Sequence, residues 1–506
     1  MSGKKVLLTS TSFEKTVLVT AVDENSSGVQ MTENSHYPLG LGYLHSFLEK
    51  NGFNVETAWL NMLSLNICRE KLFDKIESFR PDVIGLQILT PNRVSSINIL
   101  NDLFNRYNNL LVVAGGIHAT VMYEQLLRVF PRLIIVLGEG EYTYLELLTD
   151  NKLNPANIPG IAFTLNGKVL INPRRELISD LDSLPFPKHS AFWHEKREVA
   201  SIITSRGCPF ACSFCSLDNI SQRRIRFRSI SNVIEEIKFL ISSFKNLKAI
   251  CIHDDCFLLN TERAIDFCRE IINLKPNIDF YCSARLKPLT PELVIFLEKA
   301  NFRLVMFGLE TGDENILRKT NKKITIQDAE NAISLFRNSK IDIYMFLIVG
   351  LPGETNNSIN NTIKFIRKLQ RIKYIRYTSD IALLGVYPGT SIYTDLVKAG
   401  KMDDEFWLKN ELTPLYTQEN DLQTLFYFKQ KLINSICIDR FKTLRGFSRQ
   451  ITMLFYIIRY ILKEEKFYVL RDLIPEKIFN HEQFQLVARK IYNKLIFLLN
   501  RRRYDY

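Results

Sequence analysis

Three cysteines stand close together in the loop Cys208-Pro-Phe-Ala-Cys212-Ser-Phe-Cys215. Three residues separate the first pair and two separate the second, and Gly207 and Pro209 are residue types that shape a tight loop. Thiolates with this spacing can converge on one iron–sulfur cluster, and three of them leave the fourth iron of a [4Fe–4S] cube open. An open iron can chelate the amino and carboxylate groups of an amino-acid-like cofactor and pass it one electron. The loop therefore predicts a metal centre that does redox chemistry.

A structural zinc site is the alternative interpretation of this loop. Structural zinc takes four ligands, usually as two closely spaced pairs. The fourth ligand would have to come from Cys251, Cys256 or a histidine, and none of these is paired in that way. Cys251 and Cys282 lie inside strand-like runs, which is typical of buried thiols and not of a second cluster. The cluster interpretation is favoured.

Composition describes a globular, basic chain. It has 506 residues, 46% hydrophobic and 24% charged, with a formal net charge of +12. This length predicts several domains, and the charge by itself selects no partner. The opening residues lack the apolar run of a signal peptide, and no window is long enough for a membrane span, so we expect a cytoplasmic protein. Its cysteines are then expected to be thiols and metal ligands, not disulfides.

Short apolar runs alternate with helical patterns through residues 1–150. The strand-like runs cover residues 5–9, 55–60, 82–89, 110–114 and 133–137, and a helical pattern covers 40–51. This alternation predicts an α/β domain, Rossmann-like (flavodoxin-like), with a parallel sheet covered on both faces. Ligands bind such sheets at the carboxyl ends of the strands. The residues expected at those ends are Thr90, Asn92, Gly115, Gly116, Gly138 and Glu139.

Three further regions follow along the chain. Residues 151–195 are rich in proline and predict a linker, with a small hairpin at Asn166-Gly167. Over residues 196–398 the alternation returns, with strand-like runs at 199–204, 247–252, 278–283, 304–309, 343–349 and 377–384, and helical patterns that include 231–242 and 326–338. Six such units predict a partial TIM-type (β/α)6 barrel with its chemistry at the carboxyl ends of the strands. Residues 399–506 predict a helical extension, strongest over 421–506.

The cysteine loop and the barrel together resemble the radical S-adenosylmethionine (radical SAM) family. The stretches that match it in order are Cys208–Cys215, Ile252–Phe257, Ser283–Arg285, Gly308–Gly312 with Asn321–Thr325, Val349–Glu354 and Tyr387–Thr390. The resemblance implies that S-adenosylmethionine binds beside the cluster, in contact with Phe214, Asp254, Asp255, Ser283, Arg285, Glu310, Gly350, Pro352 and Gly353. Arg285 could pair with the cofactor carboxylate, and Glu310 could accept hydrogen bonds from its ammonium or ribose. Structural roles are the alternative for each.

The order of sheet domain, linker and barrel resembles the cobalamin-dependent subgroup of this family. The stretches that carry this likeness are Tyr37–Leu44, Pro81–Gly85, Ala114–Thr120 and Gly138–Glu141. It implies cobalamin as a further cofactor, held by the six strand-end residues named above. The Asp-x-His-x-x-Gly signature that brings a histidine to cobalt is absent, and His118 is expected to form a loop hydrogen bond instead. A sheet domain that binds nothing is the alternative.

The resemblance implies a radical SAM enzyme that transfers a methyl group from cobalamin to an unactivated carbon of a small molecule. Its electron donor would be a flavodoxin or ferredoxin. Radical cyclisation or rearrangement, and a non-catalytic metal- or cobalamin-responsive binding protein, remain alternatives. A tRNA methylthiotransferase would need three further N-terminal cysteines, but only Cys68 lies in the first 200 residues, so no nucleic acid partner is expected. The apolar run at 451–462 could press on a membrane surface, although core packing is favoured.

Overall fold

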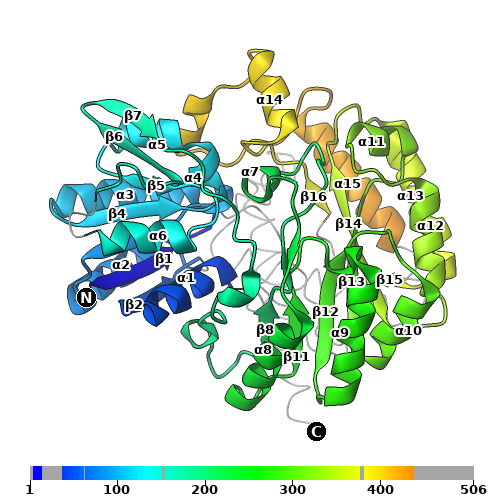
Figure 1. The fold of residues 1–506 in the computed structure, drawn as a ribbon. Coiled ribbons are helices and arrows are strands. Elements are labelled where there is room, and N and C mark those ends of the chain that lie inside the picture. Colours follow the sequence, from blue (N-terminus) through cyan, green and yellow to red (C-terminus); the bar gives the residue numbers. More distant parts are fainter. Residues whose placement is uncertain (1–3, 14–36, 62, 151–153, 377–380, 438–506) are drawn as a thin grey trace, which may run out of the picture. The chain divides into compact units, whose positions relative to one another are not determined.

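The computed structural model describes residues 4–13, 37–61, 63–150, 154–376 and 381–437. Its first sheet has the strand order β2-β1-β3-β4-β5-β6-β7 (Figure 1). The strands are β1 (Lys5–Ser10), β2 (Asn54–Trp59), β3 (Val83–Gln87), β4 (Leu111–Gly115), β5 (Ile134–Val136), β6 (Ile161–Leu165) and β7 (Lys168–Ile171). Strands β1 to β5 run parallel, as the alternating pattern predicts.

Helices cover this sheet on both faces. They are α1 (Leu39–Lys50), α2 (Leu65–Phe79), α3 (Arg93–Arg106), α4 (Ile117–Val121), α5 (Tyr123–Val129) and α6 (Glu141–Thr149). Leu7 of β1 packs in a core that includes Leu72 of α2, whereas Leu8 packs in a second core with Leu41 of α1 and Leu147 of α6. Successive side chains of a strand point to opposite faces, so a strand buried on both faces must be apolar throughout. The doubly covered parallel sheet is confirmed.

The hairpin predicted at Asn166-Gly167 joins β6 to β7. Both turn residues have positive φ, 51° and 74°, as a tight two-residue hairpin turn requires. Strand β6 pairs antiparallel with β5, so residues 161–171 extend the first sheet and are not part of a linker. The sequence conceals this because β7 is a largely exposed edge strand with little apolar alternation.

A second sheet has the order β15-β14-β13-β12-β11-β8, all parallel, and β16 pairs with β14. Its strands are β8 (Val199–Ile202), β11 (Ala249–Ile252), β12 (Asp279–Ala284), β13 (Phe302–Glu310), β14 (Asp342–Val349), β15 (Ile375–Arg376) and β16 (Ala382–Leu383). Among the described strands none closes the sheet from β15 to β8. The partial parallel barrel is therefore confirmed.

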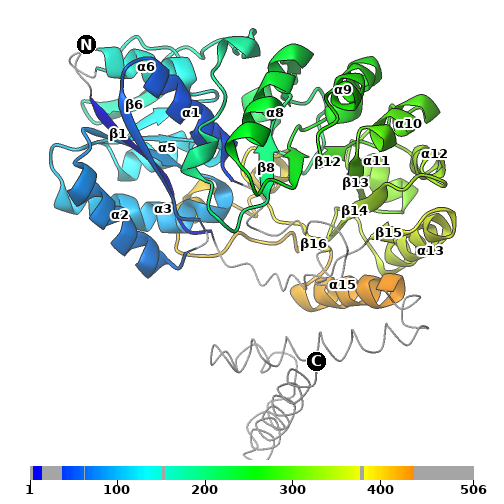
Figure 2. The same ribbon diagram turned by 90° about the horizontal axis from the view of Figure 1, so that it is seen from below.

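The barrel helices lie in a row along the outer side of these strands (Figure 2). They are α8 (Ile230–Ser243), α9 (Thr261–Leu274), α10 (Pro291–Lys299), α12 (Ile326–Leu335) and α13 (Asn356–Ile372). Each begins with a side-chain oxygen that accepts a hydrogen bond from a backbone N–H of the first turn. The capping residues are Ser229, Asn260, Thr290, Thr325 and Thr355. Such caps satisfy donors that the helix leaves open and so fix where each helix begins.

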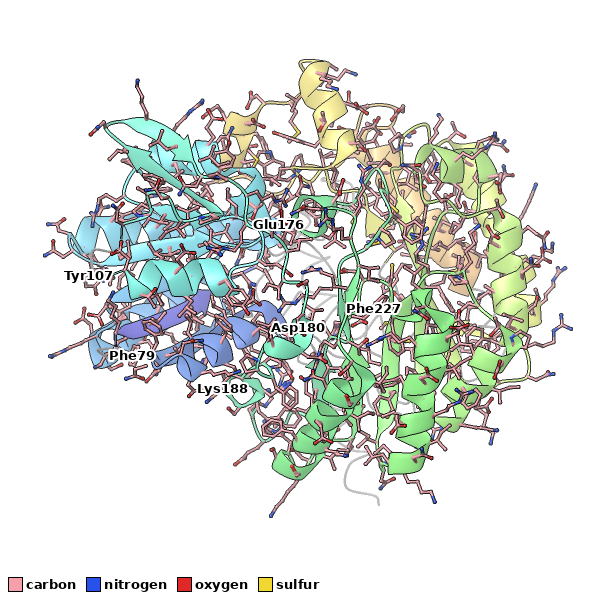
Figure 3. All side chains as sticks on the ribbon, in the orientation of Figure 1. Phe79, Tyr107, Glu176, Asp180, Lys188 and Phe227 are labelled. Carbon is pink, nitrogen blue, oxygen red and sulfur yellow. The ribbon has the colours of Figure 1, made fainter. Side chains whose placement is uncertain are left out.

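The segment between β7 and β8 contains Glu176, Asp180 and Lys188 (Figure 3). Lys188 donates to Glu49 of α1 at 2.6 Å, and Asp182 accepts from the backbone of Ser229 at 3.0 Å.

Beyond the barrel lie α14 (Ser391–Lys398) and α15 (Leu422–Cys437). Helix α15 agrees with the helical prediction for 421–506, whose remainder, with the run at 451–462, lies outside the described residues. None of the described helices combines the length and apolarity needed to cross a bilayer.

Candidate active site

The cysteine loop begins at Gly207, where only glycine fits. This residue follows the short strand β9 (Ser205–Arg206) and has a φ of +94°. A Cβ here would lie 2.2 Å from the carbonyl oxygen of Arg224. The backbone N–H of Gly207 donates to the exposed carboxylate of Asp255 at 3.2 Å. The predicted cofactor contact Asp255 therefore lies directly at the start of the loop.

Backbone contacts hold the middle of the loop on two sides. Ser213 donates its N–H to the carbonyl of Thr320 at 2.9 Å, and the Asn321 side chain donates to the carbonyl of Ala211 at 2.8 Å. On the other side, the N–H of Ile392 at the start of α14 donates to the carbonyl of Ser213 at 3.2 Å. The loop is thus positioned by segments that follow β13 and β16.

All three cysteines of the loop are free thiols, and each is at least partly exposed. The hydrogen bond between Cys208 and Cys256, whose sulfurs lie 3.4 Å apart, lowers the pKa of Cys208. Arg285 donates from Nη1 to the sulfur of Cys212 at 3.8 Å. No three ligating side chains in the described part of the chain close around a single-ion site. A four-iron cube holds its thiolates farther apart than one ion does, and a loop of three available thiols fits it.

Glu310 and Lys322 form a buried ion pair beside the loop. Glu310 ends β13 with a φ of +71°, at a register shift between β13 and β14. Its carboxylate pairs with the Lys322 ammonium, which also lies 5.8 Å from the centre of the Phe214 ring. Arg285 lies over the Phe210 ring at 3.6 Å. A strained backbone with a buried charge is typical of functional sites. The predicted contacts Glu310, Phe214 and Arg285 therefore lie in one neighbourhood, which sequence reasoning described without Lys322.

Asp254 has a structural role, which the sequence left open as the alternative to a cofactor contact. It is 2% exposed and accepts hydrogen bonds from the N–H of Thr204 at 2.5 Å, from its hydroxyl at 2.6 Å, and from the Ser205 hydroxyl at 2.6 Å. Both carboxylate oxygens are thus used to hold the end of β8 against the segment after β11. These hydrogen bonds give Asp254 a positioning role, and its contact with the cofactor stays a prediction. Ser283 lies half-buried near the end of β12.

The predicted adenine loop at Gly350, Pro352 and Gly353 is closed by Glu354. Gly350 and Gly353 both have positive φ, and Glu354 accepts the Gly350 N–H at 2.6 Å. Glu354 is 2% exposed. A carboxylate that bends back onto its own loop fixes the backbone, which is what close approach to a flat ring requires.

Replacing Glu354 by glutamine is expected to remove a pH dependence of stability. Burial raises the pKa of this carboxyl to about 7, against the opposing effect of the Gly350 hydrogen bond. A raised carboxyl pKa gives stability that is full below the ordinary value and is lost as the pH rises through about 7. Glutamine keeps the acceptor and carries no charge. Between pH 5 and 8 the free energy of unfolding of the wild type should fall by up to about 3 kcal/mol, whereas that of Glu354→Gln should not show this fall.

The measurement is thermal unfolding of the cofactor-free protein across that pH range. Glu270→Gln, at an exposed position of α9, is the matched control and should follow the wild type. Equal pH slopes for the wild type and Glu354→Gln would contradict the assigned burial of a protonated carboxyl.

The carboxyl edge of the first sheet offers a cradle at Gly115, Gly116 and Gly138. A Cβ on Gly116 (φ +99°) would lie 2.7 Å from the carbonyl oxygen of Ile88, whereas one on Gly138 would meet nothing within 4 Å. His118 Nδ1 hydrogen-bonds to the hydroxyl of Thr90 at 3.1 Å, so the expected loop hydrogen bond is confirmed. Open backbone at this edge is what a flat ring and its tail require.

Buried polar atoms without partners lie at the same edge. Among the described residues, His118 Nε2 and the side-chain oxygen of Gln87 have no hydrogen-bond partner. Burial lowers the pKa of His118 to about 3, so its ring is neutral. Buried polar atoms normally find a partner. The cradle and these open positions fit a polar, ring-shaped ligand such as cobalamin.

Asn92, a predicted cofactor contact, is used inside the fold. Its oxygen accepts the Leu89 N–H at 2.7 Å, and its amide donates to the Gln87 carbonyl at 3.0 Å and to the Ser10 hydroxyl at 3.2 Å. It is fully buried. Asn92 therefore shapes the turn after β3, and its contact with the cofactor stays a prediction.

Glu139 binds the segment that leads into the cysteine loop, and its contact with the cofactor likewise stays a prediction. It pairs with Arg206 at 3.2 Å and with Arg226 of β10 (Arg226–Phe227) at 2.7 Å, and Arg206 pairs also with Glu141 at 2.7 Å. It accepts the N–H of Ile178 at 2.9 Å as well. Burial alone would raise the pKa of Glu139, but the Arg226 hydrogen bond and the Arg206 charge bring it below its usual value. We call the four charged residues Glu139, Glu141, Arg206 and Arg226 the buried clamp. Arg206 directly precedes Gly207, and this position beside the cysteine loop is the sequence feature that could have indicated the ion pairs.

Two family models match the chain. Residues 202–366 match the radical SAM superfamily, and residues 28–148 match the B12 binding domain. The chain therefore carries a radical SAM domain preceded by a B12 binding domain. With the thiol loop in the first match and the glycine cradle in the second, its cofactors are a [4Fe–4S] cluster, S-adenosylmethionine and cobalamin.

Known proteins are similar to this chain over most of its length. An uncharacterized methyltransferase of Pyrococcus horikoshii is 29% identical over 79% of this chain and 85% of its own length. An anaerobic magnesium-protoporphyrin IX monomethyl ester cyclase of Rubrivivax gelatinosus is 28% identical over 68% of this chain and 64% of its own. The cobalamin-dependent radical enzyme OxsB is similar in fold, with a TM-score of 0.67 and 18% identity over 97% of this radical SAM chain and 75% of its own.

Proposed function

We propose that this radical SAM enzyme transfers a methyl group from cobalamin to an unactivated carbon of a small molecule. The observation that carries the proposal is the presence of both sites in one chain, joined by the buried clamp that ties Glu139 of the cobalamin domain to Arg206, directly before the cysteine loop. The similarity to a methyltransferase supports it. A cytoplasmic location, with a flavodoxin or ferredoxin as electron donor, belongs to the same proposal.

The cofactors supply the difficult chemistry. When bound, the cluster would supply the electron for reductive cleavage of S-adenosylmethionine and so for hydrogen abstraction from an unreactive C–H bond, and cobalamin would supply the methyl group. The chain's own residues position these groups. Arg285 is placed for the carboxylate of S-adenosylmethionine, Glu310 with Lys322 for its ribose and amine, and the loop closed by Glu354 for its adenine. Gly115, Gly116, Gly138 and Thr90 are proposed to receive the corrin and its tail.

Radical cyclisation is the second candidate, because of the similarity to a cyclase. The two candidates consume S-adenosylmethionine differently. A methyltransferase recharges cobalamin from S-adenosylmethionine and releases S-adenosylhomocysteine, whereas a cyclase releases only the products of reductive cleavage.

The test uses anaerobic full-length protein loaded with both cofactors, a low-potential reductant and S-adenosylmethionine. We expect 5′-deoxyadenosine together with S-adenosylhomocysteine, the latter at about one equivalent per cobalamin before substrate is added. Deoxyadenosine without S-adenosylhomocysteine would favour cyclisation or rearrangement. Neither product would indicate the non-catalytic binding protein.

A further inference from the structure

Cys256 contacts a cluster ligand without belonging to the cysteine motif. Its sulfur lies 3.4 Å from that of Cys208, and the residue is 1% exposed. Nothing in the spacing of the three motif cysteines required a fourth thiol at this point. It cannot replace a ligand at another corner of the cube, because it already touches the sulfur of Cys208.

The backbone on both sides of the contact is fixed. Asp254 holds Thr204 and Ser205, and Asp255 holds the N–H of Gly207, so the residues before each cysteine are tied together. The carbonyl of Cys256 accepts the N–H of Leu259 at 3.1 Å, which holds the turn after it. The local fold therefore positions the backbone that carries both sulfurs.

Ligation decides the direction of the hydrogen bond. A cysteine bound to iron is a thiolate and has no proton to give. Of the two thiols, only Cys256 can then donate. Reduction of the cluster adds one electron and no proton, so negative charge on the ligand sulfurs increases. A donor aimed at such a sulfur stabilises the reduced form and raises the reduction potential.

We propose that Cys256 is a positioning residue whose S–H group donates to the sulfur of Cys208 and makes the cluster easier to reduce. The electron comes from the low-potential donor, and the proton stays on Cys256 throughout. This goes beyond the proposed function and does not depend on methyl transfer. The two can fail separately. If the protein forms no S-adenosylhomocysteine but its cluster becomes harder to reduce without Cys256, the proposed methyl transfer is refuted and this inference stands.

The experiment compares Cys256→Ala and Cys256→Ser with the wild type, all full-length and loaded with both cofactors. The EPR signal of the reduced cluster is integrated during a redox titration with dithionite and mediators. Because an S–H group is a weak donor, we expect the ratio of reduced to oxidised cluster in Cys256→Ala to fall about three- to tenfold at the wild-type midpoint, tenfold being about 59 mV for one electron. Serine keeps a donor and should restore the ratio at least in part.

Cys268→Ala is the matched control, since this cysteine is buried on α9 away from the loop. It should leave the ratio at the wild-type value. An unchanged ratio in Cys256→Ala, or an equal fall in the Cys268→Ala control, would overturn the proposal. If Cys256→Ala holds no cluster, Cys256→Ser provides the test. A ratio of reduced to oxidised cluster in Cys256→Ser below one tenth of the wild-type value would overturn the proposal as well.

Discussion

Cys212→Ala is expected to abolish both the brown colour of the [4Fe–4S] cluster and all reductive cleavage of S-adenosylmethionine. Cys212 is the middle ligand of the loop and the one whose sulfur accepts a hydrogen bond from Arg285. Two thiolates cannot hold the [4Fe–4S] cluster in this loop, and without the cluster there is no open iron to chelate S-adenosylmethionine. The measurements are iron and sulfide content after anaerobic reconstitution, the visible spectrum, and deoxyadenosine release.

The control is again Cys268→Ala, which removes a thiol of the same size from a buried helix position. It should keep wild-type iron content and wild-type deoxyadenosine release. Unchanged iron in Cys212→Ala would remove the basis of the cluster assignment. Zinc in the wild-type loop would do the same, because structural zinc has no open position for a sulfonium cofactor.

The cluster site was predictable because its ligands are local. Cys208 to Cys215 form one short loop, and the spacing of the thiols carries the chemistry directly. Glu310 was predictable as well, since the end of a strand in a parallel barrel faces the site whatever the neighbouring strands contain. Neither inference needed to know which distant residue packs against which.

The structural partners of Glu139 and Asp254 were not predictable for the opposite reason, since these partners are distant in sequence. Glu139 is 87 residues from Arg226, and Asp254 is 50 residues from Thr204. A carboxylate at a strand end predicts a ligand equally well whether the ligand is a cofactor or a buried arginine. Only the pairing of loops decides between these, and no periodicity in the chain reports it.

The hairpin at Asn166-Gly167 shows the same limit for the fold. Its turn was predicted from two residues, because positive φ at both positions is a local demand. Its place in the first sheet was not, because β6 reaches β5 by long-range backbone hydrogen bonds that leave no pattern in the sequence.

Arg206→Met is expected to destabilise the protein by about 3–5 kcal/mol, since it leaves the clamp carboxylates of Glu139 and Glu141 buried without their shared cation. Side-chain exposure is 15% for Arg206, 10% for Glu139 and 6% for Glu141, so water cannot take the place of the guanidinium. Methionine keeps most of the volume, and the loss is therefore electrostatic. The measurement is the urea midpoint for unfolding of the cofactor-free protein, monitored with one spectroscopic probe in each domain.

Two comparisons separate the buried charge from a general effect of losing an arginine. Arg223→Met removes an exposed ion pair with Asp218, where the arginine side chain is 59% exposed, and should cost less than about 1 kcal/mol. Adding Glu141→Gln to Arg206→Met removes the one clamp carboxylate left without a cation, since Glu139 keeps its ion pair with Arg226 at 2.7 Å. The double variant should recover much of the loss, because breaking a buried pair costs more than replacing it whole. If this double variant is no more stable than Arg206→Met, the clamp does not act through charge. Recovery in the probes of both domains would show that the clamp couples the cobalamin domain to the loop that holds the cluster.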